Sequence, residues 1–439
     1  MKIYDSLTNK TFDLINKKLS IYNCGPTVYN DVHIGNIRPL ITFDVLVRFL
    51  KNQKFDITYI HNITDIDDKI INKAKEEKKT EMEISSFYTN HYLEIVKQLN
   101  ALPMLMPKVS ENINGIIEYI NKLVQNNGAY VTNEGNVYFD VNKVSNYGTL
   151  SHQNINQLIE GSRKELASDK KFPLDFALWK KTETGLNWKS PWSIGRPGWH
   201  TECAYFISKL VGDHVTIHGG GIDLKFPHHE NENAQNNAIF HRNIADLWMH
   251  VGHINVNNEK MAKSLGNFVL VKDLLIKYTP NDLRWFMYQT KYENPLNYSE
   301  DLINQSSNDL LKLFQQLNQG YVQMILNDVA PLNNKNNIDE KFVQSLDDDL
   351  NFPEAVAVLW KQAKGLTHLY RSKKWNEFQN EADVIKKELN IFGIVYKSPL
   401  EDSNIHSLVI EYKKALNEKN YIVSDKYRQQ LIDMKVING

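Results

Sequence analysis

Hydrophobic positions near the start of the chain alternate between two short strands and one helix. Apolar residues at 19–23 and at 55–60 are spaced as in strands. Between them apolar side chains recur every four residues, at Ile37, Ile41, Val45 and Phe49. A strand, a helix and a strand in such a short stretch form a βαβ unit, and its two strands lie parallel. The pattern therefore predicts an α/β domain with a parallel sheet.

The same sheet is expected to continue much later in the chain. Further strand patterns occur at 215–217 and at 250–256. The region between the two halves opens with an amphipathic helical pattern, followed by a hairpin-like pattern at 130–139. From Asp301 onward the spacing is almost wholly helical, with a polar loop or linker at 333–337. We therefore predict an α/β nucleotide-binding fold that is split by an insertion and followed by an all-α C-terminal region.

These patterns place the domain boundaries. The length of 439 residues exceeds the roughly 250–300 residues at which a single core stops growing, so roughly two to four domains are expected. The expected segments are a first half of the α/β domain at 1–106, a connective insertion at 107–193, a second half at 194–250, a junction domain at 251–300, a helical bundle at 301–390 and a short C-terminal domain at 391–439.

Composition narrows the class of protein. A balance of 51 basic against 52 acidic residues gives a net charge of −1, so any nucleic-acid partner must be held by a local patch. Two cysteines allow at most one disulfide, which suits a reducing compartment. No apolar stretch approaches the roughly 18 residues of a membrane span, and the first residues lack the apolar block of a signal peptide. We expect a cytoplasmic protein.

Two separate segments have the composition of phosphate-binding elements. His33 and Asn36 enclose a Gly at the expected start of the first helix, where backbone N–H groups can meet a phosphate. Alone, this turn is explained equally well by a histidine that caps the helix. The segment 260–264, Lys-Met-Ala-Lys-Ser, carries Lys260 and Lys263 on an expected loop that could close over a triphosphate. Their occurrence in the two halves of one split fold favours a nucleotide site.

Four further residues have the chemistry of metal ligands. His228 and Glu232 are spaced i, i+4 on an expected helix that begins near Pro227, so they share one face. Both cysteines lie beside other motifs: Cys24 ends the first strand, and Cys203 follows the segment 198–202. We therefore expect a zinc site of two thiolates, one imidazole and one carboxylate. The alternative is a pair of inert buried cysteines next to a helix-capping cluster.

Three glycines follow the strand at 215–217 and suggest close packing against a flat ligand such as adenine. These are Gly219, Gly220 and Gly221, in the segment 218–223. A plain turn would also explain them. Trp248 and Trp285 are expected in the core and not in the site.

In order, these motifs resemble those of the cysteinyl-tRNA synthetases, a family of class I aminoacyl-tRNA synthetases. The resemblance covers nearly the whole chain. It rests on the segments 23–29, 33–36, 62–69, 175–180, 196–203, 218–223, 226–233 and 260–264.

The resemblance implies a Rossmann-type catalytic domain, a lysine loop of the KMSKS type, a bundle that binds tRNA and a C-terminal anticodon region. It implies ligation of L-cysteine to cysteine tRNA through a cysteinyl adenylate, with ATP, Mg²⁺ and one zinc ion per chain held by the four residues above. Lys263 would contact ATP, and we expect a monomer. Cysteine would be surrounded by Thr64, Trp199 and Asp223. In the chemistry His33, Asn36, Lys260 and Lys263 would align the phosphates and neutralise their charge.

The chain departs from the family pattern at three places. Asn36 stands where the class I motif often has a second His, so an amide would donate to the phosphates. Ala262 replaces the usual Ser and leaves both lysines in place. The tail after 422–428 is short, which bears on anticodon contacts and not on the chemistry.

Two other functions remain open at this stage. A related ATP-dependent ligase joins cysteine to an amino sugar in mycothiol synthesis and shares the zinc and ATP parts. The long helical region after Asp301 and the form of the segment 24–29 favour tRNA instead. A zinc-dependent RNA-binding module without catalysis is a third possibility, against which the intact His33 and Lys263 elements count.

Overall fold

The computed structural model describes residues 1–153, 169–261, 266–332 and 337–438. The chain divides into two compact units, Met1–Ile254 with Lys260–Leu274, and Asn255–Glu259 with Leu275–Gly439. Lys263 and most of the polar segment at 333–337 lie outside the described residues.

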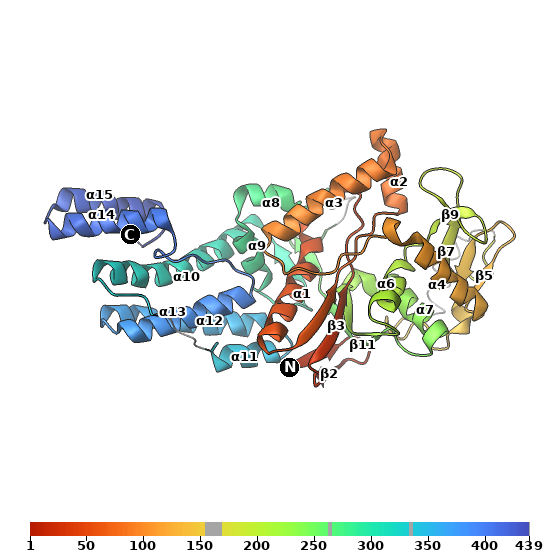
Figure 1. Cartoon of the computed structure of the whole chain (residues 1–439), viewed down its shortest axis with the longest axis horizontal. Helices are drawn as coiled ribbons and strands as arrows, with labels where there is room; N and C mark the ends of the chain where they lie inside the picture. Colours follow the sequence, from red (N-terminus) through yellow and green to blue (C-terminus); the bar gives the residue numbers. More distant parts are fainter. Residues whose placement is uncertain (154–168, 262–265, 333–336, 439) are drawn as a thin grey trace. The chain divides into compact units, whose positions relative to one another are not determined.

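A four-stranded parallel sheet forms the centre of the first unit (Figure 1). This confirms the predicted α/β class. Helix α1 (Ile34–Asn52) packs against the sheet, and most of its side chains are buried. The strand order is β11 (Ala245–Val251), β10 (Val215–Gly221), β3 (Lys18–Asn23) and β4 (Asp56–Ile60).

Two strand predictions needed correction. The strand expected at 250–256 is two strands, because β11 ends at Val251 and β12 (Ile254–Val256) joins another sheet. The carbonyl oxygens in the gap accept hydrogen bonds from the buried Arg38 guanidinium, at 2.8 Å from Gly252 and 3.1 Å from His253. Strand β10 also continues through all three glycines, which were expected to follow the strand.

The insertion folds as a helix against an antiparallel sheet. The predicted helix is α4 (Ile113–Gln125), and the predicted hairpin is β5 (Ala129–Val131) with β6 (Val137–Phe139). The order of the five strands is β5-β6-β7-β9-β8. The remaining strands are β7 (Phe176–Lys181), β8 (Trp188–Lys189) and β9 (Ile194–Pro197).

Several shorter elements complete the first unit. The hairpin of β1 (Lys2–Asp5) and β2 (Lys10–Asp13) is antiparallel. The other elements are α2 (Asp68–Glu77), α3 (Glu81–Gln98), α6 (Glu202–Leu210), α7 (Glu230–Phe240), the 3₁₀ turns Ser110–Asn112, Val141–Lys143 and Ile222–Leu224, and the π-helical turn Lys225–His229.

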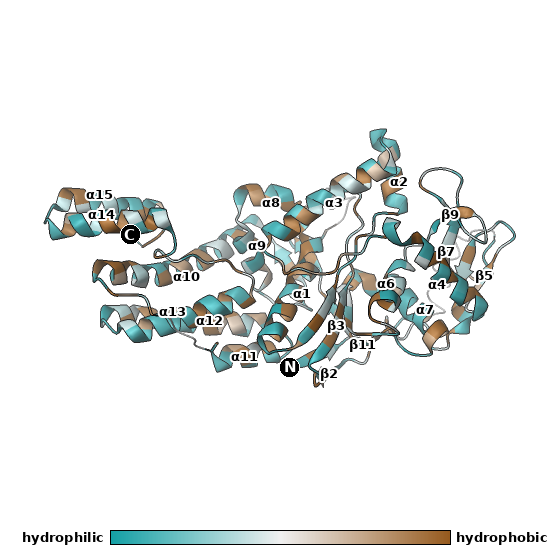
Figure 2. Cartoon of the chain, in the orientation of Figure 1, coloured by the Kyte–Doolittle hydropathy of each residue, from teal (hydrophilic) through white to brown (hydrophobic). Residues whose placement is uncertain are grey.

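The C-terminal region is almost wholly helical, as predicted. Figure 2 shows hydrophobic and hydrophilic residues mixed along these helices, as expected for amphipathic packing.

A small sheet, formed by residues before 301, has the strand order β13 (Glu259–Lys260), β12, β14 (Leu296–Tyr298). The helices are α8 (Val271–Lys277), α9 (Pro280–Met287), α10 (Glu300–Leu326), α11 (Glu340–Asp347), α12 (Phe352–Arg371), α13 (Trp375–Ile391), α14 (Ser403–Asn417) and α15 (Tyr421–Asp433).

Trp248 and Trp285 are fully buried, as predicted.

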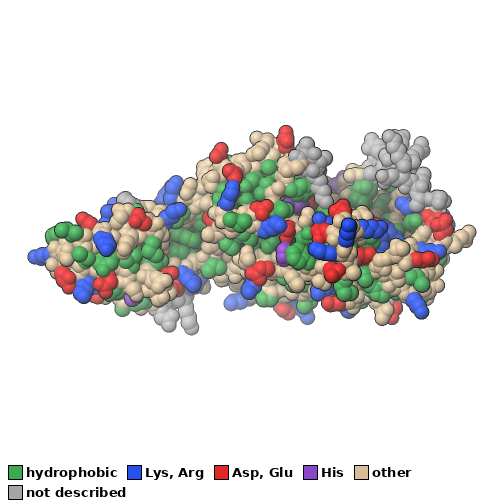
Figure 3. Space-filling view, turned by 90° about the horizontal axis from the view of Figure 1, so that it is seen from above, with side chains coloured by type: hydrophobic (Ala, Val, Ile, Leu, Met, Phe, Trp, Pro, Cys, Tyr) green, Lys and Arg blue, Asp and Glu red, His purple; other side chains and the backbone are tan. Residues whose placement is uncertain are grey.

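Charged side chains of both signs are interspersed on the face drawn in Figure 3, in keeping with the balanced composition. In the part of the chain that the structure describes, no helix has the length and apolarity needed to cross a membrane.

A buried carboxyl group in the helical region makes stability depend on pH. Glu388 of α13 accepts hydrogen bonds from the Asp339 backbone N–H at 2.9 Å and from the Gln362 amide at 3.4 Å. Its second oxygen is buried without a hydrogen-bond partner among the described residues. Burial raises the pKa of Glu388 to about 8.

Glu388→Gln is expected to stabilise the protein more at pH 8 than at pH 5. An unfolded glutamate releases its proton near pH ~4.3, whereas folded Glu388 keeps it to about pH 8, so the free energy of unfolding falls as pH rises through this window. The increase in the free energy of unfolding caused by the substitution, measured by urea unfolding, should differ by more than about 1 kcal/mol between the two pH values. The control Glu377→Gln changes an exposed residue of the same helix. Equal effects of Glu388→Gln at both pH values would contradict this account.

Candidate active site and metal centre

Four side chains with metal-ligand chemistry meet at the carboxyl ends of the parallel strands. Cys24 directly follows β3, and its backbone N–H donates to the Gly219 carbonyl oxygen at 3.0 Å. Cys203 lies in the first turn of α6, His228 in the π-helical turn, and Glu232 in the first turn of α7. All four side chains are buried, and their potential ligand atoms lie within 4.8 Å of one another.

The contacts within this cluster are direct. The two sulfur atoms are 3.8 Å apart, and the Cys203 sulfur lies 3.6 Å from His228 Nε2. Glu232 Oε1 lies 2.7 Å from His228 Nε2 and 3.7 Å from the Cys24 sulfur. The sequence pattern therefore identified four residues that the fold brings together. The helix α7, however, begins at Glu230 and not near Pro227, so the spacing of His228 and Glu232 spans the junction between the turn and the helix.

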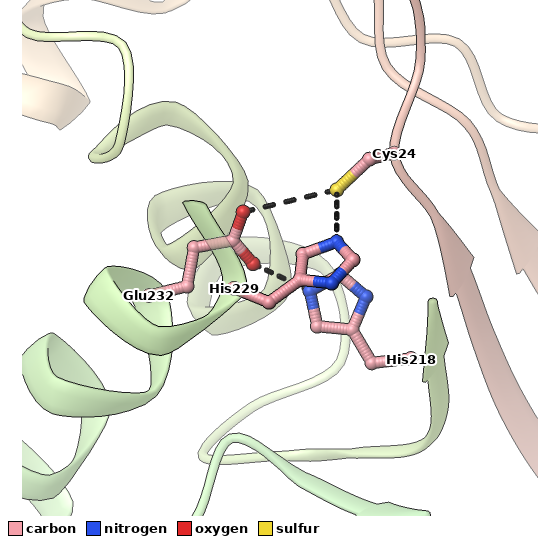
Figure 4. Close-up of side chains that lie close together, drawn as sticks. All are labelled: Cys24, His218, His229 and Glu232. Carbon is pink, nitrogen blue, oxygen red and sulfur yellow. Dashed lines mark hydrogen bonds and ion pairs between the residues drawn. The ribbon is translucent and has the colours of Figure 1, made fainter. Parts of the chain in front are cut away.

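A second group shares two of these residues. Cys24 and Glu232 also lie within reach of His218 and His229, and these four side chains are drawn in Figure 4. His229 Nε2 lies 3.3 Å from the Cys24 sulfur, and His218 Nε2 lies 2.5 Å from Glu232 Oε2. The two groups differ in donor chemistry, because the first contains two sulfur atoms and the second only one.

Hydrogen bonds connect His218 and His229 to neighbouring groups of the fold. His218 already contacts two acceptors, the Tyr22 carbonyl oxygen through Nδ1 at 3.1 Å and Glu232 through Nε2. His229 Nδ1 lies 2.8 Å from His250 Nε2, and His250 Nδ1 lies 2.5 Å from the Ser6 hydroxyl. Such outer partners orient the residues that contact a metal directly.

Burial and neighbouring charges shift the pKa values of the cluster in opposite directions. Burial raises the pKa of the Cys203 thiol, and so does the neighbouring Cys24 sulfur. Burial also opposes ionisation of Cys24, but its hydrogen bond with Cys203 and the nearby His229 and His218 lower the pKa of that thiol overall. In the same way His228 and His218 outweigh burial and lower the pKa of Glu232. The cluster therefore favours a thiolate and a carboxylate, the ionised forms that bind cations.

Three histidines near the cluster favour their neutral forms. Burial lowers the pKa of His229, of His250 and of His200, whose Nδ1 lies 3.2 Å from His228 Nδ1. Sequence reasoning missed His200, His229 and His250 as parts of the site. The adjacent pair His228-His229 was a visible signal, but nothing in the sequence indicated His250, which reaches the site from β11.

A cavity with a volume of about 690 Å³ adjoins the cluster. Cys24, Cys203 and His228 line one part of it, and the His33 turn lines another. The three residues expected around cysteine line it as well: Thr64, Trp199 and Asp223. The Trp199 ring stacks on the His228 ring with centroids 4.3 Å apart, so this tryptophan marks the end of the cavity nearest the cluster.

The Thr64 hydroxyl is oriented by a buried network. It donates to Glu202 Oε1 at 2.7 Å and accepts from the Asn62 amide at 3.2 Å. Asn62 Oδ1 in turn accepts from the Gly25 backbone N–H at 2.9 Å. Burial raises the pKa of Glu202. This network joins the segment after β4 to α6 and to the Cys24 loop.

The turn expected to bind phosphate lies at the start of α1, as the sequence indicated, and it also has a capping role. His33 is the N-cap of α1, and the Asn36 side-chain oxygen Oδ1 accepts from the His33 backbone N–H at 3.0 Å. A side chain at Gly35 would lie 3.0 Å from His33 Nδ1, so the glycine leaves room for the imidazole. Both readings of this motif therefore apply: the histidine caps the helix and also lines the cavity.

A smaller cavity of about 210 Å³ also involves His33 and Asn36. Lys260 and Met261 line it, so the start of the lysine loop faces the same turn as the phosphate motif. Gly221 lines both cavities, whereas Gly219 and Gly220 do not line them. A Cβ at Gly219 would lie 1.8 Å from the Met249 carbonyl oxygen, so this glycine is explained by close packing of neighbouring strands.

Comparison with known proteins identifies the family. A model of the class I (C) tRNA synthetase catalytic domain matches residues 11–308, and a DALR domain model matches residues 341–396. The chain is 44% identical to a cysteine–tRNA ligase of Ureaplasma parvum and 46% identical to one of Malacoplasma penetrans, over all of both chains in each case. This chain belongs to the class I cysteine–tRNA ligase family.

A solved structure supports the fold of this cysteine–tRNA ligase family member. The methionyl-tRNA synthetase of Mycobacterium tuberculosis in complex with methionyl-adenylate has a TM-score of 0.62 over 90% of this chain and 91% of that chain. At 13% sequence identity this likeness concerns the fold alone.

Metal content distinguishes the two candidate donor groups. Cys203 belongs only to the first group and His229 only to the second. We expect Cys203→Ser to lose bound metal after dialysis against a weak chelator, because one of two sulfur donors is removed. His229→Asn should lose much less metal than Cys203→Ser, because it leaves all four expected donors in place and an outer residue typically changes affinity by only about 10–100-fold. Elemental analysis of the purified proteins measures both, and the reverse result would assign the metal to the second group.

Proposed function

We propose that this chain ligates L-cysteine to the 3′ end of cysteine tRNA through a cysteinyl adenylate, and that zinc at the first donor group selects the substrate thiol. One observation carries the proposal: a buried group of two thiols, an imidazole and a carboxylate opens onto the same cavity as the His33 turn. The two relatives named above are cysteine–tRNA ligases, and the similarity extends over the whole length of each.

The residues of the first group fit zinc. Tetrahedral zinc sites are built from thiolate, imidazole and carboxylate donors, and Cys24, Cys203, His228 and Glu232 supply these. The low pKa values of Cys24 and Glu232 favour their ligating forms. When bound, zinc supplies a site that accepts sulfur well and favours a thiolate over an alcohol.

This chemistry answers the main specificity problem of such an enzyme. Serine differs from cysteine by one atom, and an apolar pocket separates such near-isosteres by only about a hundredfold. Trp199 closes the cavity over His228, and Thr64 and Asp223 provide polar groups around it. These three residues would hold the remainder of the amino acid while its sulfur is recognised at the cluster.

The other end of the cavity would hold ATP. In the first step the cysteine carboxylate attacks the α-phosphorus and pyrophosphate leaves, so catalysis consists mainly of alignment and of cations that face the developing charge. His33 and the Asn36 side-chain amide, whose oxygen is engaged in capping, would donate to the phosphates. Gly221 lines both cavities and would allow close approach of the nucleotide, whereas Gly219 and Gly220 would contribute only by their place in the strand that leads to it. Lys260, Lys263 and Mg²⁺ would neutralise the triphosphate.

In the second step the terminal ribose hydroxyl of the tRNA attacks the adenylate. The helices of 301–390 would contact the tRNA, and the segment 391–439 would lie near its anticodon. Each of the six segments expected from the sequence would form a separate domain or half-domain with the role given above. The protein would act as a cytoplasmic monomer.

Transfer of labelled cysteine to acid-precipitable tRNA tests the proposal. With ATP, Mg²⁺ and total tRNA, the purified protein should charge tRNA with cysteine and not with serine supplied in parallel. Cysteine-dependent release of pyrophosphate without labelled tRNA would instead support ligation to an amino sugar.

Lys263→Ala tests the role of the lysine loop. We expect the rate of cysteine-dependent pyrophosphate exchange to fall by more than about tenfold, because one charge that faces the leaving pyrophosphate is lost. The KM for cysteine should stay within about twofold, since the loop does not hold the amino acid. Equal changes in both quantities would contradict a role confined to the phosphates.

A further inference from the structure

A single lysine projects over the part of the cavity nearest the cluster. Lys69 Nζ lies 5.5 Å from the centroid of the Tyr29 ring and 5.9 Å from that of Trp199. All three residues line the larger cavity. Since Trp199 stacks on His228, the Lys69 ammonium group lies on the amino-acid side of the cavity.

The backbone of Lys69 is held in place while its side chain is exposed. Lys69 is the second residue of α2, and its backbone N–H donates to the capping Asp67 carboxylate at 2.8 Å. The neighbouring Asp68 forms ion pairs with Lys180 and Arg196. Within the described ranges, no carboxylate lies at ion-pair distance from Lys69. Its charge is therefore available to a ligand.

The distribution of charge in the cavity gives this cation a distinct position. Among the described residues that line the larger cavity, Lys69 is the only lysine or arginine, whereas Asp31, Asp223 and Asp273 also line it. Lys260 lines the smaller cavity beside His33 instead. A ligand with a carboxylate near the cluster end would meet Lys69 as the nearest permanent positive charge.

We propose that Lys69 binds the α-carboxylate of the amino-acid substrate and orients it for attack on the α-phosphorus. The inference rests on the proposed function, because it places the substrate thiol at the Cys24 and Cys203 end of the cavity. The amino acid then extends from the cluster past Trp199, with its carboxylate toward Lys69. One carboxylate oxygen forms the new bond to phosphorus as pyrophosphate leaves, and the Lys69 proton stays on its nitrogen throughout.

The role of Lys69 is tested by comparing the binding of two thiols, one with a carboxylate and one without. Calorimetry on the zinc-loaded protein would compare cysteine with cysteamine, which has the same thiol and amine but no carboxylate. Lys69→Met should weaken cysteine binding by about 10–100-fold, the usual size of a hydrogen bond to a charged group. Cysteamine binding should change by less than about twofold, and Lys69→Arg should recover most of the cysteine affinity.

Lys73→Met is a matched control one turn further along α2. Lys73 pairs with Glu77 at 3.1 Å and does not line the cavity, so its removal should leave the binding of both thiols unchanged. Equal weakening of cysteine and cysteamine in Lys69→Met would show a structural role and overturn the proposal. Unchanged cysteine affinity would overturn it as well.

The test separates this proposal from the wider function. Wild-type protein that binds cysteine no better than serine would contradict the proposed function itself. Wild-type protein that selects cysteine, together with a Lys69→Met variant that does so with the same affinity, would contradict only the assignment of Lys69.

Discussion

Burial of ionisable groups in a single cluster is the constraint on which the catalytic unit depends. Cys24, Cys203 and Glu232 are each almost fully buried. Charges in such surroundings are costly unless they are paired or bind a metal. His228 and His218 both contact the Glu232 carboxylate and so stabilise its negative charge. A metal ion would balance the remaining negative charge.

This constraint explains why distant segments converge. Cys24 ends a strand near the start of the chain, whereas Cys203 and Glu232 lie on helices that follow the insertion. The parallel sheet brings these segments together because the carboxyl ends of β3 and β10 lie at one edge. The His33 turn follows β3 at the same edge, so the fold places the two cysteines and the turn expected to bind phosphate in one cavity.

Local patterns predicted the elements well. The helix at 34–52, the hairpin of the insertion and the helical C-terminal region all have clear apolar spacing, and the structure contains each of them. The four residues of the candidate metal group were identified because the two cysteines are rare and therefore informative positions, and because His228 and Glu232 have the i, i+4 spacing of paired ligands.

Features that depend on tertiary contacts escaped prediction. The strand expected at 250–256 is interrupted at Gly252 and His253, whose carbonyl oxygens accept hydrogen bonds from Arg38. No local pattern in the sequence reveals this interaction. The glycines expected after the strand belong to β10 itself, and the close approach of the neighbouring strand leaves no room for a side chain at Gly219. His250 on β11 and Ser6 in the turn after β1 join the site from positions far apart in sequence.

The most direct test of the central claim is the number of sulfur atoms bound to the metal, measured by X-ray absorption at the zinc edge. The account predicts two sulfur ligands from Cys24 and Cys203 in the free protein and a third when cysteine is added, with no change on addition of serine. A sulfur count that stays the same with cysteine, or that starts at one, would contradict selection of the substrate thiol at this cluster.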